Sequence, residues 1–348
     1  METSEIERRL KSARREIKRS RTTCTVLAVL LAVAVCAFAW SAISRAVIKS
    51  KYDAATEQQA TTVEPTGSKE TYDRTRLREM ADEVASLTEL MSRLYPDYMV
   101  YGDRDGEIAY REIDATMGLN EYDFSTLVTD EETGRKTYTL PDGTATLTGI
   151  DVSSYQGSID WEKVKEDGIS FAIVRAGSRG YESGTMFEDD NFIDNIKGAN
   201  EAGVPVGVYF YSQAATTEEA VEEAQYIIES IAELDVSWPI VFDMEEENSS
   251  SSRTRELTAT QKTDITLAFC DTVTQAGYKP MIYGNMRWFA ENVELSRLVG
   301  IEKWFAQYFS RPYFPYEYGM WQYSASGKVD GISGSVDMNI AFKDYGAE

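Results

Sequence analysis

Eight short runs of apolar, β-branched and aromatic residues recur between residues 147 and 342, and helical segments separate several of them. Strands that alternate with helices build a parallel sheet, and eight such repeats close that sheet into a barrel. Only a few residues separate the last three runs, so we expect an irregular α/β barrel of the TIM type over residues 148–348, with an antiparallel strand near its closure. The runs are 147–152, 171–176, 206–212, 240–245, 280–283, 303–308, 320–323 and 336–342.

The helices expected between these strands have clear start and stop signals. Thr216 followed by Glu219 is an N-terminal capping signal for one of them. Gly203 and Gly277 stand where glycine commonly ends a helix in the left-handed conformation. The predicted helices are 160–167, 190–202, 217–234 and 258–276.

The complete absence of histidine narrows the chemistry of the chain. Ser-His-Asp and Cys-His catalysis are excluded, so acid–base work falls to carboxylates, tyrosine or lysine. Three cysteines without CxxC spacing predict no metal centre, and we expect no cofactor. The formal charge of −23 predicts that no nucleic acid is a partner, because phosphate requires a basic surface.

The N-terminal segment predicts a single membrane span. Residues 1–21 carry eight basic and four acidic side chains, and residues 22–44 carry no charge. Such a run is long enough to cross a hydrocarbon core of ~30 Å as a helix. The positive-inside rule then places residues 1–21 in the cytoplasm and residues 45–348 outside the cell membrane. The alternative is secretion after cleavage near Ala39, where the sequence reads small-x-small.

The stretch between this span and the barrel divides into three predicted parts. Residues 45–70 are polar and predict a flexible stalk. Residues 71–95 predict an amphipathic helix, which either pairs two chains as a short coiled coil or packs on the next domain or on a partner. Residues 96–147 predict a small β-rich appendage, with hairpins at 98–110 and 137–147. The apolar stripe of the helix consists of Leu77, Met80, Val84, Leu87, Met91 and Leu94.

Four carboxylates fall at or near the expected strand ends. Asp151 ends the first run, Asp243 and Glu245 end the fourth, and Asp337 lies in the last. Asp243 and Glu245 are two positions apart, so in a strand both side chains point to one face. Sites in such barrels lie at the C-terminal ends of the strands, and paired acids there are typical of glycosidases. The alternative is a set of solvated acids in an acidic protein.

Other side chains near the strand ends are candidates for binding a sugar. Flat aromatic faces and hydrogen-bonding groups suit such a ligand, although core packing is an equal alternative for each residue. Arg175, at the end of the second run, either pairs with a site carboxylate or forms a structural ion pair with Asp151. The remaining candidates are Tyr209, Tyr211, Tyr283, Trp321 and Gln322.

Several motifs, in the same order along the chain, resemble the glycoside hydrolase family 25 lysozymes, which are N-acetylmuramidases. They are GIDVSSYQG at 149–157, VYFYS at 208–212, VFDME at 241–245, WFAQY at 304–308, WQY at 321–323 and VDMN at 336–339. The resemblance covers residues 148–343, and residues 98–147 resemble a leader that often precedes the domain. It implies a barrel that cleaves the β-1,4 bond between N-acetylmuramic acid and N-acetylglucosamine in peptidoglycan.

The resemblance also implies roles for the acids. Glu245 would be the general acid, and Asp243 would orient or polarise the 2-acetamido group of the substrate or act as nucleophile. Asp151 and Asp337 correspond to the other two acidic positions. Carboxylates around one groove repel one another, so we expect a raised pKa for Glu245. The alternatives are a catalytically weak glycan-binding scaffold on the outer face of the membrane and a glycosidase of different glycan specificity.

Overall fold

The computed structural model describes residues 74–347, with single gaps at Ala85, Arg104 and Asn248. The predicted cytoplasmic segment, membrane span and stalk, residues 1–70, lie outside the described residues. Within the part of the chain that is described, no helix has both the length and the apolar character needed to cross a membrane.

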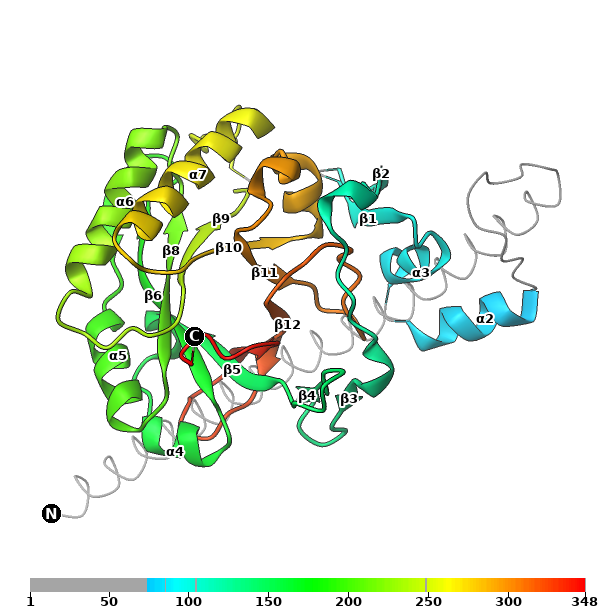
Figure 1. Ribbon diagram of the computed structural model, residues 1–348, viewed down its shortest axis with the longest axis horizontal. Helices are drawn as coiled ribbons and strands as arrows, with labels where there is room; N and C mark the ends of the chain where they lie inside the picture. Colours follow the sequence, from blue (N-terminus) through cyan, green and yellow to red (C-terminus); the bar gives the residue numbers. More distant parts are fainter. Residues whose placement is uncertain (1–73, 85, 104, 248, 348) are drawn as a thin grey trace, which may run out of the picture. The chain divides into compact units, whose positions relative to one another are not determined.

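Eight strands close into a barrel, because the first of them pairs with both the second and the last (Figure 1). Neighbouring strands are parallel except for the last one, which runs antiparallel to both of its neighbours. The predicted strand count and the antiparallel closing strand are therefore confirmed. In order around the barrel the strands are β5 (Leu147–Val152), β6 (Phe171–Arg179), β8 (Val206–Ser212), β9 (Ile240–Met244), β10 (Pro280–Asn285), β11 (Glu302–Ala306), β12 (Met320–Gly327) and β13 (Val336–Ala341).

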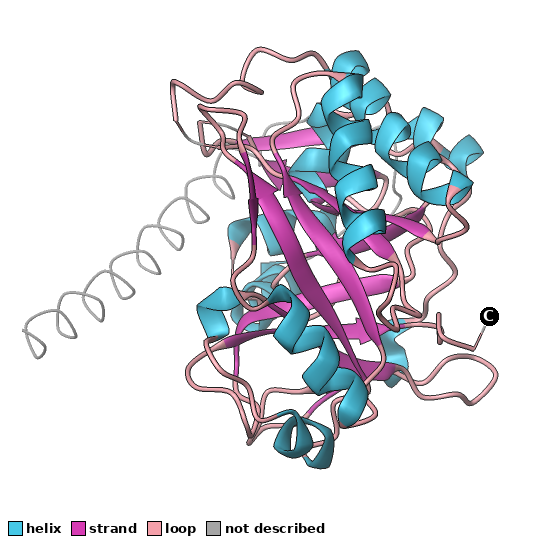
Figure 2. Cartoon of the chain, turned by 90° about the vertical axis from the view of Figure 1, so that its left-hand side faces the viewer, coloured by secondary structure: helices cyan, strands magenta, loops and turns pink. Residues whose placement is uncertain are grey.

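The four predicted helices are all present, and they cover the outside of the barrel on one side (Figure 2). The Thr216 side chain accepts a hydrogen bond from the backbone N–H of Glu219. Gly203 and Gly277 have φ angles of 72° and 88°, as a left-handed helix end requires. The helices are α4 (Trp161–Glu166), α5 (Phe192–Glu201), α6 (Thr217–Ser230) and α7 (Ala259–Gln275).

Among the described residues, no α-helix separates the strands that follow β10, and short helical turns occur there instead. A π-helical turn at Trp288–Asn292 and a 3-10 turn at Leu295–Leu298 follow β10. Further 3-10 turns span Ala115–Met117, Phe124–Thr126 and Ser154–Gln156. An unpredicted strand, β7 (Met186–Glu188), folds back antiparallel on β6 and forms a hairpin beyond the barrel wall.

Alternation along each strand divides the core into an inner and an outer layer. Phe171 lies in the inner layer and stacks on Trp238 at 4.1 Å between ring centroids. Its ring fills the space beside Gly149, where an added Cβ would lie 2.2 Å from the Phe171 ring. The outer layer, which packs against the helices, includes Phe210 and Phe242. Side chains that follow the inner pattern to the C-terminal strand ends therefore project into the barrel mouth.

The appendage that precedes the barrel is only partly as predicted. Strands β1 (Tyr98–Gly102) and β2 (Ile108–Glu112) form the first expected hairpin. The second hairpin is reduced to one isolated bridge, and β4 (Lys136–Thr137) pairs instead with β3 (Val128–Thr129). Two backbone hydrogen bonds flank this bridge, from the N–H of Leu140 to the carbonyl of Thr144 and from the N–H of Thr146 to the carbonyl of Tyr138.

Residues 71–95 hold two helices, α2 (Arg74–Glu83) and α3 (Leu87–Leu94), instead of one. Ser86 begins the second helix by accepting a hydrogen bond from the N–H of Glu89, which interrupts the predicted stripe. Helix α3 lies against the loop after β11: Glu89 accepts from the N–H of Ser310 at 3.2 Å, and Arg93 donates to the Tyr313 hydroxyl at 2.9 Å. The predicted packing on the next domain is therefore confirmed for α3.

Candidate functional site

A cavity of about 220 Å³ lies at the C-terminal ends of the barrel strands. Nine of the ten predicted site residues line it. Asp337 reaches the cavity from the start of β13, because that strand runs in the opposite direction and pairs Asp337 directly with Asp151. The lining consists of Asp151, Val152, Ser153, Tyr155, Gln156, Arg175, Tyr209, Tyr211, Asp243, Glu245, Tyr283, Trp304, Gln322 and Asp337.

Two side-chain amides hold Asp151. Its Oδ2 atom accepts hydrogen bonds from Gln322 Nε2 at 2.9 Å and from Asn339 Nδ2 at 2.8 Å. Other donors occupy the amide oxygens and so turn both NH₂ groups toward the carboxylate. These donors are the hydroxyls of Tyr283 (2.9 Å) and Tyr308 (2.8 Å) on Gln322 and the indole N–H of Trp304 (2.8 Å) on Asn339.

Burial and mutual repulsion raise the pKa values of the acids. Burial raises the pKa of the Asp151 carboxyl, and the charge of Asp337 adds to that effect. Burial likewise raises the pKa of Asp243, with further contributions from Glu245 and Asp151. The side chains of Asp151 and Asp243 are buried and not solvated, and Oδ1 of Asp243 makes no hydrogen bond within the described residues.

The predicted rise in the pKa of Glu245 is confirmed. Burial is its largest cause, followed by repulsion from Glu247 and Asp337. The sequence predicted repulsion as the only cause of the raised pKa, and the structure adds burial of the carboxyl group as the larger one. A carboxyl group of this kind keeps its proton to a higher pH than a solvated one and can donate it to a bound substrate.

The aromatic candidates divide between the cavity and the core. Tyr209, Tyr211 and Tyr283 line the cavity. Trp321, contrary to expectation, does not: its side chain is fully buried in the outer layer, and its indole N–H donates to the carbonyl of Gln307 at 2.8 Å. Adjacent residues of a strand face opposite sides, so Gln322 points inward and Trp321 outward.

Arg175 lies in the cavity wall, and its ion-pair partner is Asp189 instead of Asp151 or another acid of the cavity, the two predicted alternatives. Its Nε donates to Oδ2 of Asp189 at 2.8 Å, and its guanidinium lies over the ring of Tyr155 at 4.9 Å. Asp189 directly follows the unpredicted strand β7, so the sequence pattern gave no sign of this partner. Arg175 thereby supports a tyrosine that is 85% exposed at the edge of the cavity.

Sequence reasoning missed several residues of the wall. Ser153, Tyr155 and Gln156 lie in the loop directly after β5, and loops in this position form the mouth of such barrels. Their position directly after a predicted strand could therefore have identified them as candidates for the cavity wall. Asn339 and Tyr308 were missed because their contacts depend on strand register, which the sequence does not display.

Comparisons with known proteins agree on one family. The sequence model of the glycosyl hydrolases family 25 matches residues 150–332. The chain is 29% identical over 194 residues to the autolytic lysozyme of Clostridium acetobutylicum, covering 56% of this chain and 55% of that protein. It is 32% identical over 216 residues to lysozyme M1 of Streptomyces globisporus, covering 57% and 69%.

Solved structures give the same picture. The modular autolysin LytC from Streptococcus pneumoniae, in complex with a synthetic peptidoglycan ligand, superposes with a TM-score of 0.52 at 25% sequence identity. That match covers 70% of this chain and 56% of LytC. The chain thus spans little more than half the length of LytC and of the clostridial lysozyme.

Proposed function

The chain belongs to the glycosyl hydrolases of family 25, and from this premise we propose that it is a peptidoglycan hydrolase of the muramidase type. Its reaction would be hydrolysis of the β-1,4 bond between N-acetylmuramic acid and N-acetylglucosamine. The observation that carries the proposal is the convergence of four carboxylates on one cavity at the barrel mouth: Asp151, Asp243, Glu245 and Asp337.

Glu245 is the general acid in this proposal. Its raised pKa keeps the carboxyl protonated until the glycosidic oxygen accepts the proton and the leaving sugar departs. The remaining sugar ring develops positive charge, which the ionised members of the acidic cluster stabilise. The hydrogen bonds that Gln322 and Asn339 donate to Asp151 favour its anionic form against the effect of burial. As an anion, Asp151 can stabilise the positive charge on the sugar ring.

Asp243 is the partner of Glu245. Its Oδ1 atom makes no hydrogen bond within the described residues, so it is free to accept one from the N–H of the 2-acetamido group. That contact would align the acetamide carbonyl for attack on the anomeric carbon. Direct attack by Asp243 is the other route, and the tyrosines and Gln322 would bind the sugar in either case.

Digestion of purified peptidoglycan by the full-length protein tests the proposal. We expect wild type to release fragments with muramic acid at the reducing end, identified by mass spectrometry, and Glu245→Gln to lose about 10²–10⁴-fold in rate. Glu246→Gln is the matched control, since Glu246 pairs with Arg287 and does not line the cavity. Binding without cleavage by wild type would favour the scaffold, and cleavage of another glycan would favour a different specificity.

We also propose that the protein is anchored in the cell membrane by residues 22–44, with the barrel outside. The support is the uncharged run and the basic excess before it. The mass of the protein recovered from the membranes and from the medium tests the anchor. A chain that begins at Met1 or Glu2 agrees with it, whereas a chain that begins at Trp40 shows cleavage and secretion.

A further inference from the structure

The carboxyl group of Glu245 receives no hydrogen bond from any described residue, so its place in the cavity depends on its backbone. The backbone carbonyl of Glu245 accepts a hydrogen bond from Nε2 of Gln213 at 3.0 Å. Gln213 directly follows β8, whereas Glu245 directly follows the neighbouring strand β9. The contact therefore links the ends of two adjacent strands at the cavity.

Burial and hydrogen bonds hold the side chain of Gln213 in one position. Its side chain is fully buried. Its Oε1 atom accepts from the hydroxyl of Thr254 at 3.0 Å, which leaves the NH₂ group facing Glu245. The backbone carbonyl of Gln213 also accepts from Nη1 of Arg253 at 3.3 Å. The Gln213 amide thus bonds to both an acceptor and a donor of the loop that follows β9.

Arg253 links the backbone of Gln213 to the first turn of α6. Its two terminal nitrogens donate to the two carboxylate oxygens of Glu219 at 2.9 and 2.7 Å. Its backbone N–H donates to the carbonyl of Tyr181 at 2.9 Å. The guanidinium lies against Gly184, where an added Cβ would be 2.7 Å from Nη1. A Cβ at this position would displace the guanidinium.

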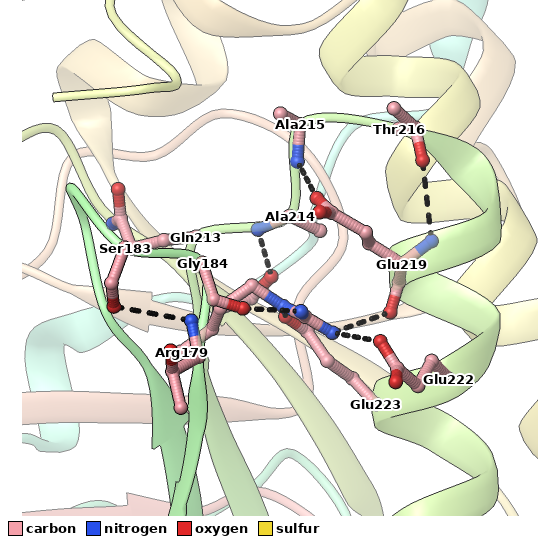
Figure 3. Close-up of polar contacts among 12 residues, drawn as sticks. Arg179, Ser183, Gly184, Gln213, Ala214, Ala215, Thr216, Glu219, Glu222 and Glu223 are labelled. Carbon is pink, nitrogen blue, oxygen red and sulfur yellow. Dashed lines mark hydrogen bonds and ion pairs between the residues drawn. The ribbon is translucent and has the colours of Figure 1, made fainter.

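Glu219 is itself fixed on both sides (Figure 3). Its Oε2 atom accepts from the N–H of Ala215 at 2.7 Å, and its own N–H donates to the capping hydroxyl of Thr216. Close by, Arg179 donates to the backbone carbonyl of Glu219 at 3.2 Å and to Glu222 at 2.8 Å. The acceptor of Arg253 is therefore a rigid point of the fold.

Polar contacts at several points hold the loop after β9. Residues 249–252 are four consecutive serines, which have no apolar surface to bury against the barrel. Glu246 and Glu247 fix the first part of the loop through Arg287 and Tyr211. Arg253 and Thr254 fix the later part by binding Gln213. Misplacement of a reacting group by about 1 Å can cost on the order of 10²-fold in rate.

We propose that Gln213 is a positioning residue for Glu245, and that Thr254 and the Arg253–Glu219 ion pair hold Gln213 in place. This proposal rests on the general-acid role of Glu245 for its kinetic consequence. Its structural half, that Gln213 fixes the backbone at Glu245, is measurable without any substrate.

The test compares the full-length protein with Gln213→Met, which keeps the length and volume but removes both hydrogen bonds. We expect kcat on peptidoglycan to fall roughly 10–100-fold with KM within about twofold of wild type. We also expect faster hydrogen–deuterium exchange in the peptide that covers residues 243–257, and unchanged exchange in β11 and β12. Arg297→Met is the control, since Arg297 forms an exposed ion pair with Asp264 and is absent from the cavity wall.

Each outcome decides the proposal. An unchanged kcat, unchanged exchange at residues 243–257, or a uniform rise in exchange over the whole barrel would overturn it. If wild type does not cleave peptidoglycan, the proposed function fails, and the local exchange measurement still decides whether Gln213 fixes the backbone. Should Gln213→Met not fold, Thr254→Val removes one donor to Gln213 and is expected to give the same local change more weakly.

A pH-dependent rescue distinguishes positioning from general stability. In Gln213→Glu the introduced carboxyl can donate to the Glu245 carbonyl only while it is protonated. Activity relative to wild type is therefore expected to rise as the pH falls. A ratio that stays constant with pH would contradict the assigned hydrogen bond.

Discussion

Glu247 offers a way to test the general acid without touching it. The hydroxyl of Tyr211 donates to Oε1 of Glu247 at 2.6 Å, which holds this carboxylate near the cavity. After burial, its charge is the largest cause of the raised pKa of Glu245. Glu247→Gln removes the charge and keeps an oxygen for Tyr211, so the pKa of Glu245 is expected to fall while the local contacts persist.

The size of the shift follows from chain geometry. Two residues of extended chain separate the groups by on the order of 7 Å. Two unit charges at that separation repel by about 0.6 kcal/mol in water and about 2.4 kcal/mol at an effective dielectric constant of about 20. At about 1.36 kcal/mol per pKa unit, the pKa of Glu245 should fall by roughly 0.4–1.7 units.

The pH profile of kcat/KM measures this shift, because it reports groups of the free enzyme. The general acid must be protonated, so activity is lost as the pH rises through its pKa. A lower pKa therefore moves the alkaline limb of the profile to lower pH, by about one unit in Glu247→Gln. Glu246→Gln should leave the limb in place, because neither Glu246 nor its partner Arg287 is among the charges that raise the pKa of Glu245. An alkaline limb that does not move in Glu247→Gln would refute the assignment of that limb to Glu245.

Three further variants test the fold, the cavity and the assembly. Gly149→Ala forces a methyl group onto the ring of Phe171 and should destabilise the protein by about 1–3 kcal/mol, seen as a lower Tm in calorimetry; an unchanged Tm would contradict the inner-layer packing. Asn339→Leu removes a hydrogen bond that lowers the pKa of Asp151, so this pKa should rise. Because the reaction needs Asp151 as an anion, the acidic limb of the pH profile should then move to higher pH. An acidic limb that does not move would show that it does not report Asp151. If residues 71–95 pair two chains, Leu87→Asp should halve the mass in detergent, whereas an equal mass for both proteins would leave the helices as packing elements only.

The barrel could be predicted from the sequence because buried parallel strands are apolar throughout and separated by capped helices. The predicted bounds of β5 and β8 match the structure. Strand β6 is longer than predicted, since its polar end, up to Arg179, pairs with β7 outside the apolar core. Apolar content marks the buried part of a strand but not its extension into a hairpin.

The position of the acids at the strand ends was also predictable, but their surroundings were not. Asp243 and Glu245 stand out because they end a strongly apolar strand. The choice between Trp321 and Gln322 depends on which of two adjacent residues faces inward, and an apolar strand gives no polar alternation to decide it. The partners of Asp151 lie 171 and 188 positions away in the chain, so only the closed barrel brings them together.

The antiparallel closing strand has a consequence for how the protein acquires its activity during synthesis. Strand β13 pairs with β5, so the first and last strands of the barrel meet only after nearly the whole domain has been made. Until then β5 and β12 each present an open edge, and Asp151 has neither Asp337 beside it nor Asn339 to hold it. A nascent or truncated chain that ends before residue 336 is thus both unable to complete the acidic cluster and prone to edge-to-edge association. The same β5–β13 pairing closes the barrel and completes the acidic cluster, and this long-range pairing is expected to be a slow step of folding.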